Sequence, residues 1–205
     1  MRYQSRLKLL CEKLELTQRE FSAILGIYHG TFFSSMARVK ELPVEHFVRI
    51  YLALDTGSKA NSAEWLYRFF VENDDEALVP LVLSRLRKVS SQWKYDNTFG
   101  GKVLAMARMQ HYGLDAKELS QRLGLAYDRY RRAERGESRL SMPVFRAIVG
   151  LAKPEHRGKF IVEFTGQGNG SLTPERLGRY LRKPPALVAK PLLRAADVAG
   201  AGLYC

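Results

Sequence analysis

Apolar residues recur at spacings of three and four along most of the chain, and no segment alternates apolar and polar residues over a sustained length. That period is typical of amphipathic helices, which bury one face and expose the other. Near the start, for example, Leu7, Leu10 and Leu14 fall on one helical face. The pattern predicts an all-α protein.

The ends of the first helices are marked by capping residues. Thr17 precedes a short apolar stripe, and Glu20 stands three residues on, which is the spacing of a capping box. Gly26 follows the stripe and is expected to end the helix in the left-handed conformation. Further helices are expected over 28–37, from Pro43 onward and over 62–72.

The same pattern occurs twice in register. The segment "LTQREFSAILGI" at 16–27 corresponds to "LDAKELSQRLGL" at 114–125, an offset of 98 residues. Asp115 and Glu118 take the places of the first capping pair. The same offset relates these further pairs: Phe21 and Leu119, Leu25 and Leu123, Gly26 and Gly124, Phe47 and Phe145, Ile50 and Ile148. So many spaced matches indicate an internal duplication.

The duplication predicts four segments. Two helical domains are expected at 1–72 and 102–170, with a helical linker at 73–101 between them. Residues 171–205 should form a C-terminal helix that begins at Pro174, followed by a tail rich in Pro, Ala and Gly. The tail is expected either to be poorly ordered or to pack on a partner.

The two halves of the chain differ in net charge. The chain has 205 residues and a net charge of +12. Residues 1–98 hold 14 Lys and Arg against 12 Asp and Glu, which gives +2, and residues 99–205 hold 19 against 9, which gives +10. Such a bias favours a polyanionic partner, nucleic acid first and an anionic membrane surface second, whereas a face tuned for solubility is the alternative.

Other chemistry finds little support in the sequence. The two cysteines lie at positions 11 and 205 without a CxxC pair, and the four histidines are dispersed. No combination of a nucleophile, a base and an orienting acid stands out. No apolar run approaches the roughly 20 residues that span a bilayer. We therefore expect a non-enzymatic protein of the cytoplasm that uses no metal and no cofactor and does not act at a membrane.

Both repeats resemble a known family. "LTQREFSAILGI…TFFSSM…LPVEHFVRIYLAL" and "LDAKELSQRLGLAYDRYRRAERGESRLSMPVFRAIVGLA" are similar to the helix-turn-helix domain of phage repressors of the lambda repressor and Cro type, the XRE-like group. The resemblance covers about residues 4–70 and 102–165, and "AERGE" matches the family's usual Glu-x-Gly segment. It implies compact bundles of about five helices that bind operator DNA, commonly with twofold symmetry.

The resemblance also implies positions for DNA contacts in the second repeat. Arg131 and Arg132 are expected to face the major groove, where each guanidinium can donate two hydrogen bonds to guanine. Arg129, Arg135 and Arg139 are placed for backbone phosphates. Groove-facing positions also fall on Ala126, Tyr127 and Asp128, with Lys117 as a phosphate contact at the start of the preceding helix. Tyr130 and, less securely, Glu134 occupy positions that turn inward.

In the first repeat the resemblance places mostly aromatic and small groups at the groove. Gln18 falls on a phosphate-contact position, where the second repeat has Ala116. The remaining expected contacts are Tyr28, His29, Gly30, Thr31, Phe33, Ser34 and Arg38, with Phe32 and Met36 turned inward. The aromatic side chains suit thymine methyl groups and protein interfaces equally well.

Two functions remain open at this stage. The first is a sequence-specific transcriptional regulator, a repressor from a bacterium or a mobile element, that binds double-stranded operator DNA in the nucleoid. It would use both heads of one chain, or a homodimer if only the basic head binds. The second is a protein-interaction adaptor or antiactivator that reuses helix-turn-helix folds, with the first domain or the C-terminal tail as its interface.

Overall fold

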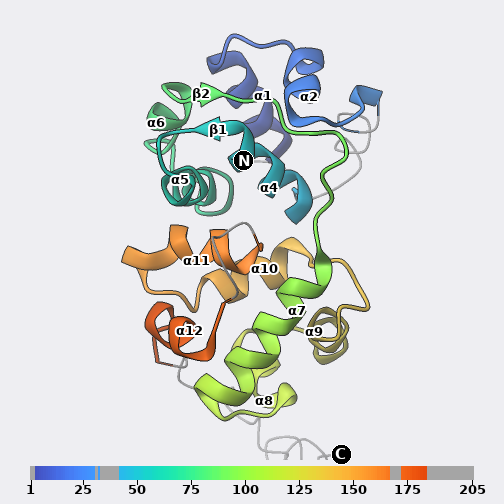
Figure 1. The fold of residues 1–205 in the computed structure, drawn as a ribbon, viewed down its shortest axis with the longest axis vertical. Helices are drawn as coiled ribbons and strands as arrows, with labels where there is room; N and C mark the ends of the chain where they lie inside the picture. The colour runs from blue at the N-terminus through green and yellow to red at the C-terminus, as the bar shows by residue number, and fades with distance from the viewer. Residues whose placement is uncertain (1–2, 31, 33–41, 167–171, 184–205) are drawn as a thin grey trace, which may run out of the picture.

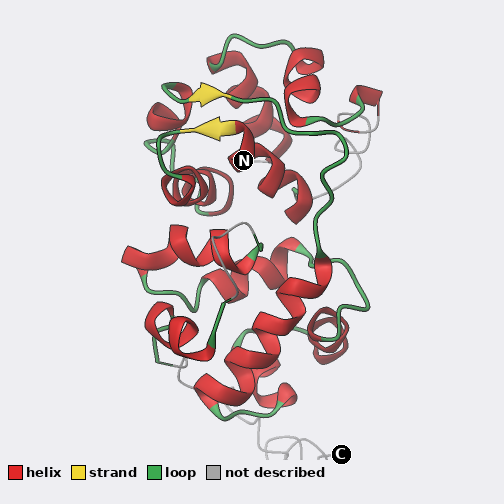
Figure 2. Cartoon of the chain, viewed as in Figure 1, coloured by secondary structure: helices red, strands yellow, loops and turns green. Residues whose placement is uncertain are grey.

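The protein consists of two helical units stacked along its long axis (Figure 1). The computed structural model describes residues 3–30, 32, 42–166 and 172–183. Within these ranges the chain is mostly helical and has one small two-stranded sheet (Figure 2). The expectation of an all-α protein is confirmed. We call residues 3–93 the first unit and residues 97–183 the second unit.

The helices of the first unit follow the apolar stripes. They are α1 (Tyr3–Lys13), α2 (Gln18–Leu25), α4 (Val44–Ala53) and α5 (Lys59–Val71). Residues 29–30 and 32 are also helical, where the third helix was expected. Thr17 and Glu20 form the predicted capping box, and Pro43 directly precedes α4 as predicted. Apolar side chains of these helices, among them Phe21, are fully buried and form the core of the unit.

The second unit repeats this order. Its elements are α7 (Asn97–Met106), the π-helical turn η1 (Ala107–Tyr112), α8 (Ala116–Arg122), α9 (Tyr127–Glu134), α10 (Met142–Val149), the 3₁₀ turn η2 (Pro154–His156), α11 (Arg157–Phe164) and α12 (Pro174–Tyr180). The turn after the second helix is the same in both units. Gly26 and Gly124 both have a φ of 66°, and the amide of the next residue donates to a carbonyl five residues back in each. The internal duplication is therefore present in the backbone.

The two units are related by an approximate twofold axis. Phe47 and Phe145, which are equivalent by the offset of 98, contact each other with ring centroids 5.2 Å apart. Gly158 of α11 lies so close to its own equivalent, Ala60 of α5, that an added Cβ would overlap the Ala60 carbonyl oxygen. Where two copies pack through the same surface, residues near the twofold axis contact their own equivalents. The chain thus resembles a symmetric dimer built from one polypeptide.

The prediction of a helical linker at 73–101 is wrong. Helix α6 covers only Leu78–Val82, and the strand β2 (Arg85–Leu86) then pairs antiparallel with β1 (Leu54–Asp55). Two residues per strand are too few to produce an alternating sequence pattern. Residues 73–93 belong to the first unit, and the boundary between the units lies near Tyr95.

The second unit has the same extension. Helix α12 begins at Pro174 as predicted, and Leu181 then forms an isolated antiparallel bridge to Ala152. The segment "LRK" at 86–88 occurs again at 181–183, at an offset of 95. Residues 172–183 are therefore the counterpart of 77–88 and complete the second unit. The predicted tail, residues 184–205, lies outside the described residues.

The contact between α5 and α11 generates a first prediction. Replacing Gly158 by Ala should lower the free energy of unfolding by about 1–3 kcal/mol, because the new methyl group collides with the backbone of α5. Urea unfolding measures this value. Gly178→Ala is the control: its Cβ would meet only the His111 ring at 3.5 Å, so the helix should be unchanged or slightly stabilised. Equal stability of both variants would contradict the close packing.

A second prediction concerns the stability of the fold at low pH. Burial is the main cause that lowers the pKa of His46 to about 4, with Arg49 and Arg139 adding to it and Glu45 opposing it. The unfolded chain, with an ordinary pKa near 6.5, therefore binds more protons than the folded chain between about pH 6.5 and 4. Stability should fall as the pH falls through this window. Urea unfolding at several pH values should show a shallower fall for His46→Gln.

Candidate nucleic-acid interface

Helices α8 and α9 are joined by a short turn that fixes the angle between them. Asp115 caps α8 by accepting a hydrogen bond from the Glu118 amide at 2.7 Å, and Glu118 accepts from the Asp115 amide at 3.1 Å. After α8, Gly124 adopts the left-handed conformation and the Leu125 amide donates to the Ser120 carbonyl at 2.9 Å. These backbone bonds close the turn, so the start of α9 is held against the end of α8.

The inward face of α9 anchors it to the rest of the unit. Tyr130 is fully buried and Ala133 nearly so. Gly101 of α7 lies directly against the carbonyls of Ala133 and Glu134, where a Cβ would come within 2.6 Å of an oxygen. Only glycine at this position lets α7 and α9 approach so closely, and the position of α9 depends on it.

An ion pair of Glu134 also attaches α9 to η1. Its buried carboxylate accepts a hydrogen bond from Arg108 of η1 at 2.7 Å and another from Arg131 at 2.6 Å. The hydrogen bond to Glu134 is the main cause that raises the pKa of Arg108. The inward position expected for Glu134 is confirmed. Arg131, however, pairs with Glu134 and is only 28% exposed, so its guanidinium is less available to a ligand than that of the exposed Arg132.

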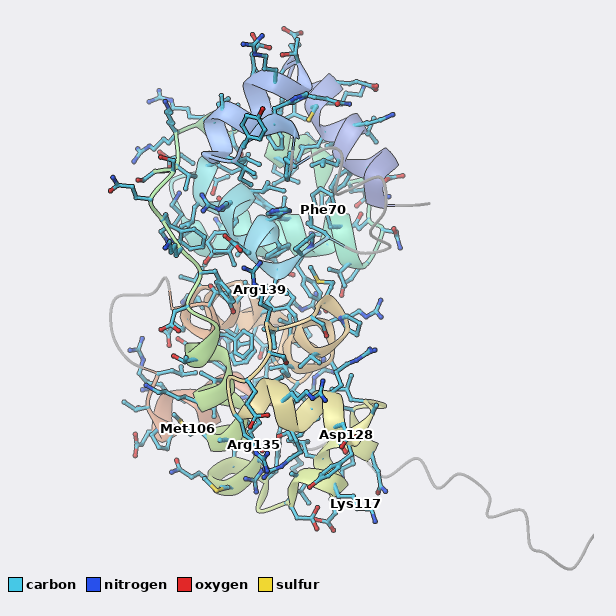
Figure 3. The ribbon with its side chains drawn as sticks, turned by 90° about the vertical axis from the view of Figure 1, so that its right-hand side faces the viewer. Phe70, Met106, Lys117, Asp128, Arg135 and Arg139 are labelled. Atoms are coloured by element: carbon cyan, nitrogen blue, oxygen red, sulfur yellow. The ribbon has the colours of Figure 1, made fainter. Side chains whose placement is uncertain are left out.

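The outward face of α9 carries most of the predicted contacts. Arg129 and Arg132 are exposed and form no ion pair with any described residue. Tyr127 is 47% exposed, and Asp128 and Lys117 are exposed beside it. In Figure 3, Lys117 and Asp128 lie together at the lower end of the second unit. The structure therefore brings these five residues to one surface.

A basic hollow lies between α9 and the segment that leads to α10. It has a volume of about 470 Å³, and its cationic lining residues are Arg129, Arg132 and Arg139. Asp128 is the one acidic residue in its lining. Three guanidinium groups around an open hollow attract phosphate, because each offers several N–H donors in a fixed plane. We call this cavity, with its three arginines, the basic hollow.

Two of the predicted arginines, Arg135 and Arg139, take part in exposed ion pairs. Arg135 pairs with Glu137 at 3.3 Å, and both side chains are more than half exposed. Arg139 is 82% exposed and lies 3.7 Å from Glu45 of the first unit, and Figure 3 shows it near the border between the two units. Exposed pairs of this kind contribute little energy and break readily. Both side chains remain available to an incoming anion.

The first unit presents a different surface on the same side. Tyr28 is 79% exposed, His29 is exposed and Gln18 is half-buried at the start of α2. The turn that follows α2 and helix α9 both lie on the right-hand side of Figure 1. Phe32 is fully buried, as expected. The other predicted residues of this head, Thr31, Phe33, Ser34, Met36 and Arg38, lie outside the described residues.

One cation of the first head was missed by the sequence analysis. Arg19 is exposed at the start of α2 and is the equivalent of Lys117 at the offset of 98. Applying the offset to every predicted contact of the second repeat would have found it. Among residues 3–30, 32, 42–166 and 172–183, no cluster of three metal-ligating side chains occurs, and no helix is long and apolar enough to cross a membrane.

Comparisons of the chain with protein-family models, with curated proteins and with solved structures found no match.

The Glu134 pair generates a third prediction. Glu134→Ala should lower the free energy of unfolding by about 3–5 kcal/mol, because it leaves two arginines without their buried partner. Glu137→Ala is the matched control, since its pair with Arg135 is exposed and worth under about 1 kcal/mol. Urea unfolding compares the two variants. Similar losses for both would show that Glu134 does not anchor α9.

Proposed function

We propose that the protein binds double-stranded DNA in a sequence-specific manner and regulates transcription, as a repressor that occupies an operator. The observation that carries the proposal is the outward face of α9, where Arg129 and Arg132 are exposed, unpaired among the described residues and fixed on a rigid helix. An α-helix fits the major groove, and arginine there donates paired hydrogen bonds to guanine. A DNA-binding role also implies a cytoplasmic, nucleoid-associated protein.

The distribution of positive charge favours duplex DNA over a small anion as the ligand. Residues 99–205 carry a net charge of +10, and the basic hollow, Lys117 and Arg135 extend along one surface of the second unit. A row of separate cations suits the regularly spaced phosphates of a duplex. We expect a steep loss of affinity with rising salt, because each neutralised phosphate releases counterions.

The approximate twofold axis supports binding by a single chain. Two heads related by such an axis match the twofold symmetry of duplex DNA, which homodimeric regulators usually exploit with two chains. Here α2 with the following turn and α8 with α9 supply the two heads. Because their exposed residues differ, the proposed operator has two unequal half-sites, and the basic head contributes most of the affinity.

A fourth prediction tests the basic head. Duplexes selected by the protein from a random library should bind Arg129→Ala/Arg132→Ala at least about 30-fold more weakly, since each guanidinium contributes about 1–3 kcal/mol. Lys159→Ala/Arg179→Ala, which removes two exposed cations from α11 and α12, is the matched control and should bind nearly normally. Fluorescence anisotropy measures both. Undiminished binding by the first variant would refute the assignment, as would the absence of selectable duplexes at low salt.

A protein-interaction role is the second candidate. Tyr28 is 79% exposed, and Val79 and Leu83 of the α6 region are 63% and 80% exposed. Apolar groups at this exposure are typical of protein interfaces. Footprinting on a selected duplex distinguishes the candidates: two protected half-sites support DNA contact by both heads, whereas one protected half-site leaves the first head to a protein partner.

A further inference from the structure

In the first unit, the chain that follows β2 fills a groove. Residues 87–93, which we call the strap, run between the end of α2 and helix α4. The Arg87 amide donates to the Ala53 carbonyl at 2.8 Å, and the Val89 amide donates to the Ile24 carbonyl at 2.7 Å. Arg49 fixes the far end, because its guanidinium donates to the Ser90 and Trp93 carbonyls.

The second unit begins the same strap, but its sequence then differs from that of the first unit. The Arg182 amide donates to the Leu151 carbonyl at 2.9 Å, as Arg87 does to the equivalent Ala53. The next positions differ from the first unit. Pro184 stands in place of Val89 and has no amide hydrogen to donate. Ala147 stands in place of Arg49, so the guanidinium that holds the strap is also missing.

Among the described residues, nothing fills the corresponding groove of the second unit. A Cβ on Gly26 would meet three backbone atoms of the strap, whereas a Cβ on the equivalent Gly124 would meet no atom within 4 Å. The open groove has a volume of about 300 Å³ and lies between the ends of α8 and α10. Its lining residues are Arg122, Leu123, Arg146, Ala147, Gly150, Leu151, Arg182 and Lys183. We call it the second-unit groove.

Four cations surround the second-unit groove, and none of them forms an ion pair with a described residue. The Nε atom of Arg122 is shielded from solvent and has no hydrogen-bond partner among the described residues. In the first unit the positions equivalent to Arg122 and Arg146 are Ile24 and Val48, which are apolar. The change from apolar to cationic at both positions indicates an anionic occupant.

The backbone of the groove favours a peptide as that occupant. The Arg122 carbonyl, equivalent to the Ile24 carbonyl that accepts from Val89, accepts no backbone hydrogen bond from the described residues. A peptide N–H can donate to it, whereas phosphodiesters of DNA have no donor. Leu123, Ala147 and Leu151 provide apolar contacts, as a residue equivalent to Val89 would need. The chain's own residues 184–205 suit the cations poorly, because they hold Lys190 and Arg194 against a single acidic side chain, Asp197.

We propose that the second-unit groove binds an extended segment of a partner protein in which one apolar residue is flanked by Asp and Glu. The segment takes the path that the strap takes in the first unit. Its apolar side chain lies where Val89 lies, its amide donates to the Arg122 carbonyl, and its carboxylates pair with Arg122, Arg146 and Lys183. This site is separate from the basic hollow and does not depend on DNA binding.

The test uses the full chain and a fluorescein-labelled peptide, Ser-Glu-Asp-Glu-Val-Asp-Glu-Asp-Ser, measured by fluorescence anisotropy. Arg122→Glu/Arg146→Glu should weaken peptide binding at least about tenfold, because close charge pairs become repulsive. Replacing the valine by serine, or methylating its amide nitrogen, should weaken binding about three- to tenfold by removing the apolar contact or the hydrogen bond. Circular dichroism checks that the variant is folded.

A matched control separates the groove from general attraction to basic protein. Lys159→Glu/Arg179→Glu makes the same change in charge on α11 and α12 and should leave peptide binding within about twofold. Equal losses in both double variants would overturn the proposal. So would indifference to the valine, because a groove with an apolar floor must recognise it.

Two further measurements identify other occupants. A chain that ends at Lys183 should bind the peptide as the full chain does. Binding at least about tenfold tighter would show that residues 184–205 occupy the groove and would overturn the proposal. Duplex DNA binding should survive Arg122→Glu/Arg146→Glu and fail in Arg129→Ala/Arg132→Ala. Loss of both ligands in the groove variant alone would assign the groove to DNA, so the two proposals fail in different ways.

Discussion

The close packing of α5 against α11 is the constraint on which the rest of the structure depends. Gly158 removes the side chain at the closest point, and Phe47 and Phe145 meet across the same axis. Two helical units of this size would otherwise be free to rotate on a single connecting segment. Because equivalent residues meet each other, the contact also fixes symmetry, and both heads come to one side of the molecule (Figure 1).

Within the second unit, the position of α9 depends on one buried carboxylate and one glycine. Glu134 joins α9 to η1 through Arg108, and Gly101 lets α7 lie against the end of α9. Such contacts make the helix rigid, so its exposed arginines need little reordering when an anion binds. The same carboxylate pairs with Arg131, which is only 28% exposed, whereas Arg129 and Arg132 face solvent.

The two units share a backbone but differ in the chemistry of their surfaces. The first head exposes aromatic groups and the second exposes guanidinium groups. A groove filled by the strap in the first unit corresponds in the second to a cationic groove that no described residue fills. Each difference comes from a few side chains placed on equivalent positions. Duplication thus gives one chain two versions of a scaffold, and we infer that they have been adapted to different partners.

The sequence by itself determined the helices, their caps and the duplication. The spacing of apolar residues, the caps Thr17 and Asp115, and the two turn glycines all act on backbone within a few residues of themselves. It also placed Tyr130 in the core and most of the cations of α9 at the surface. Only the tertiary structure decided that residues 73–93 fold onto the first unit, because its two-residue strands leave no sequence period. It alone decided that Arg131 pairs with a Glu134 that Arg108 of η1 holds inward, and that the strap has no equivalent over Gly124 in the described chain. Arg108 and the strap are both distant in sequence from the positions that they affect.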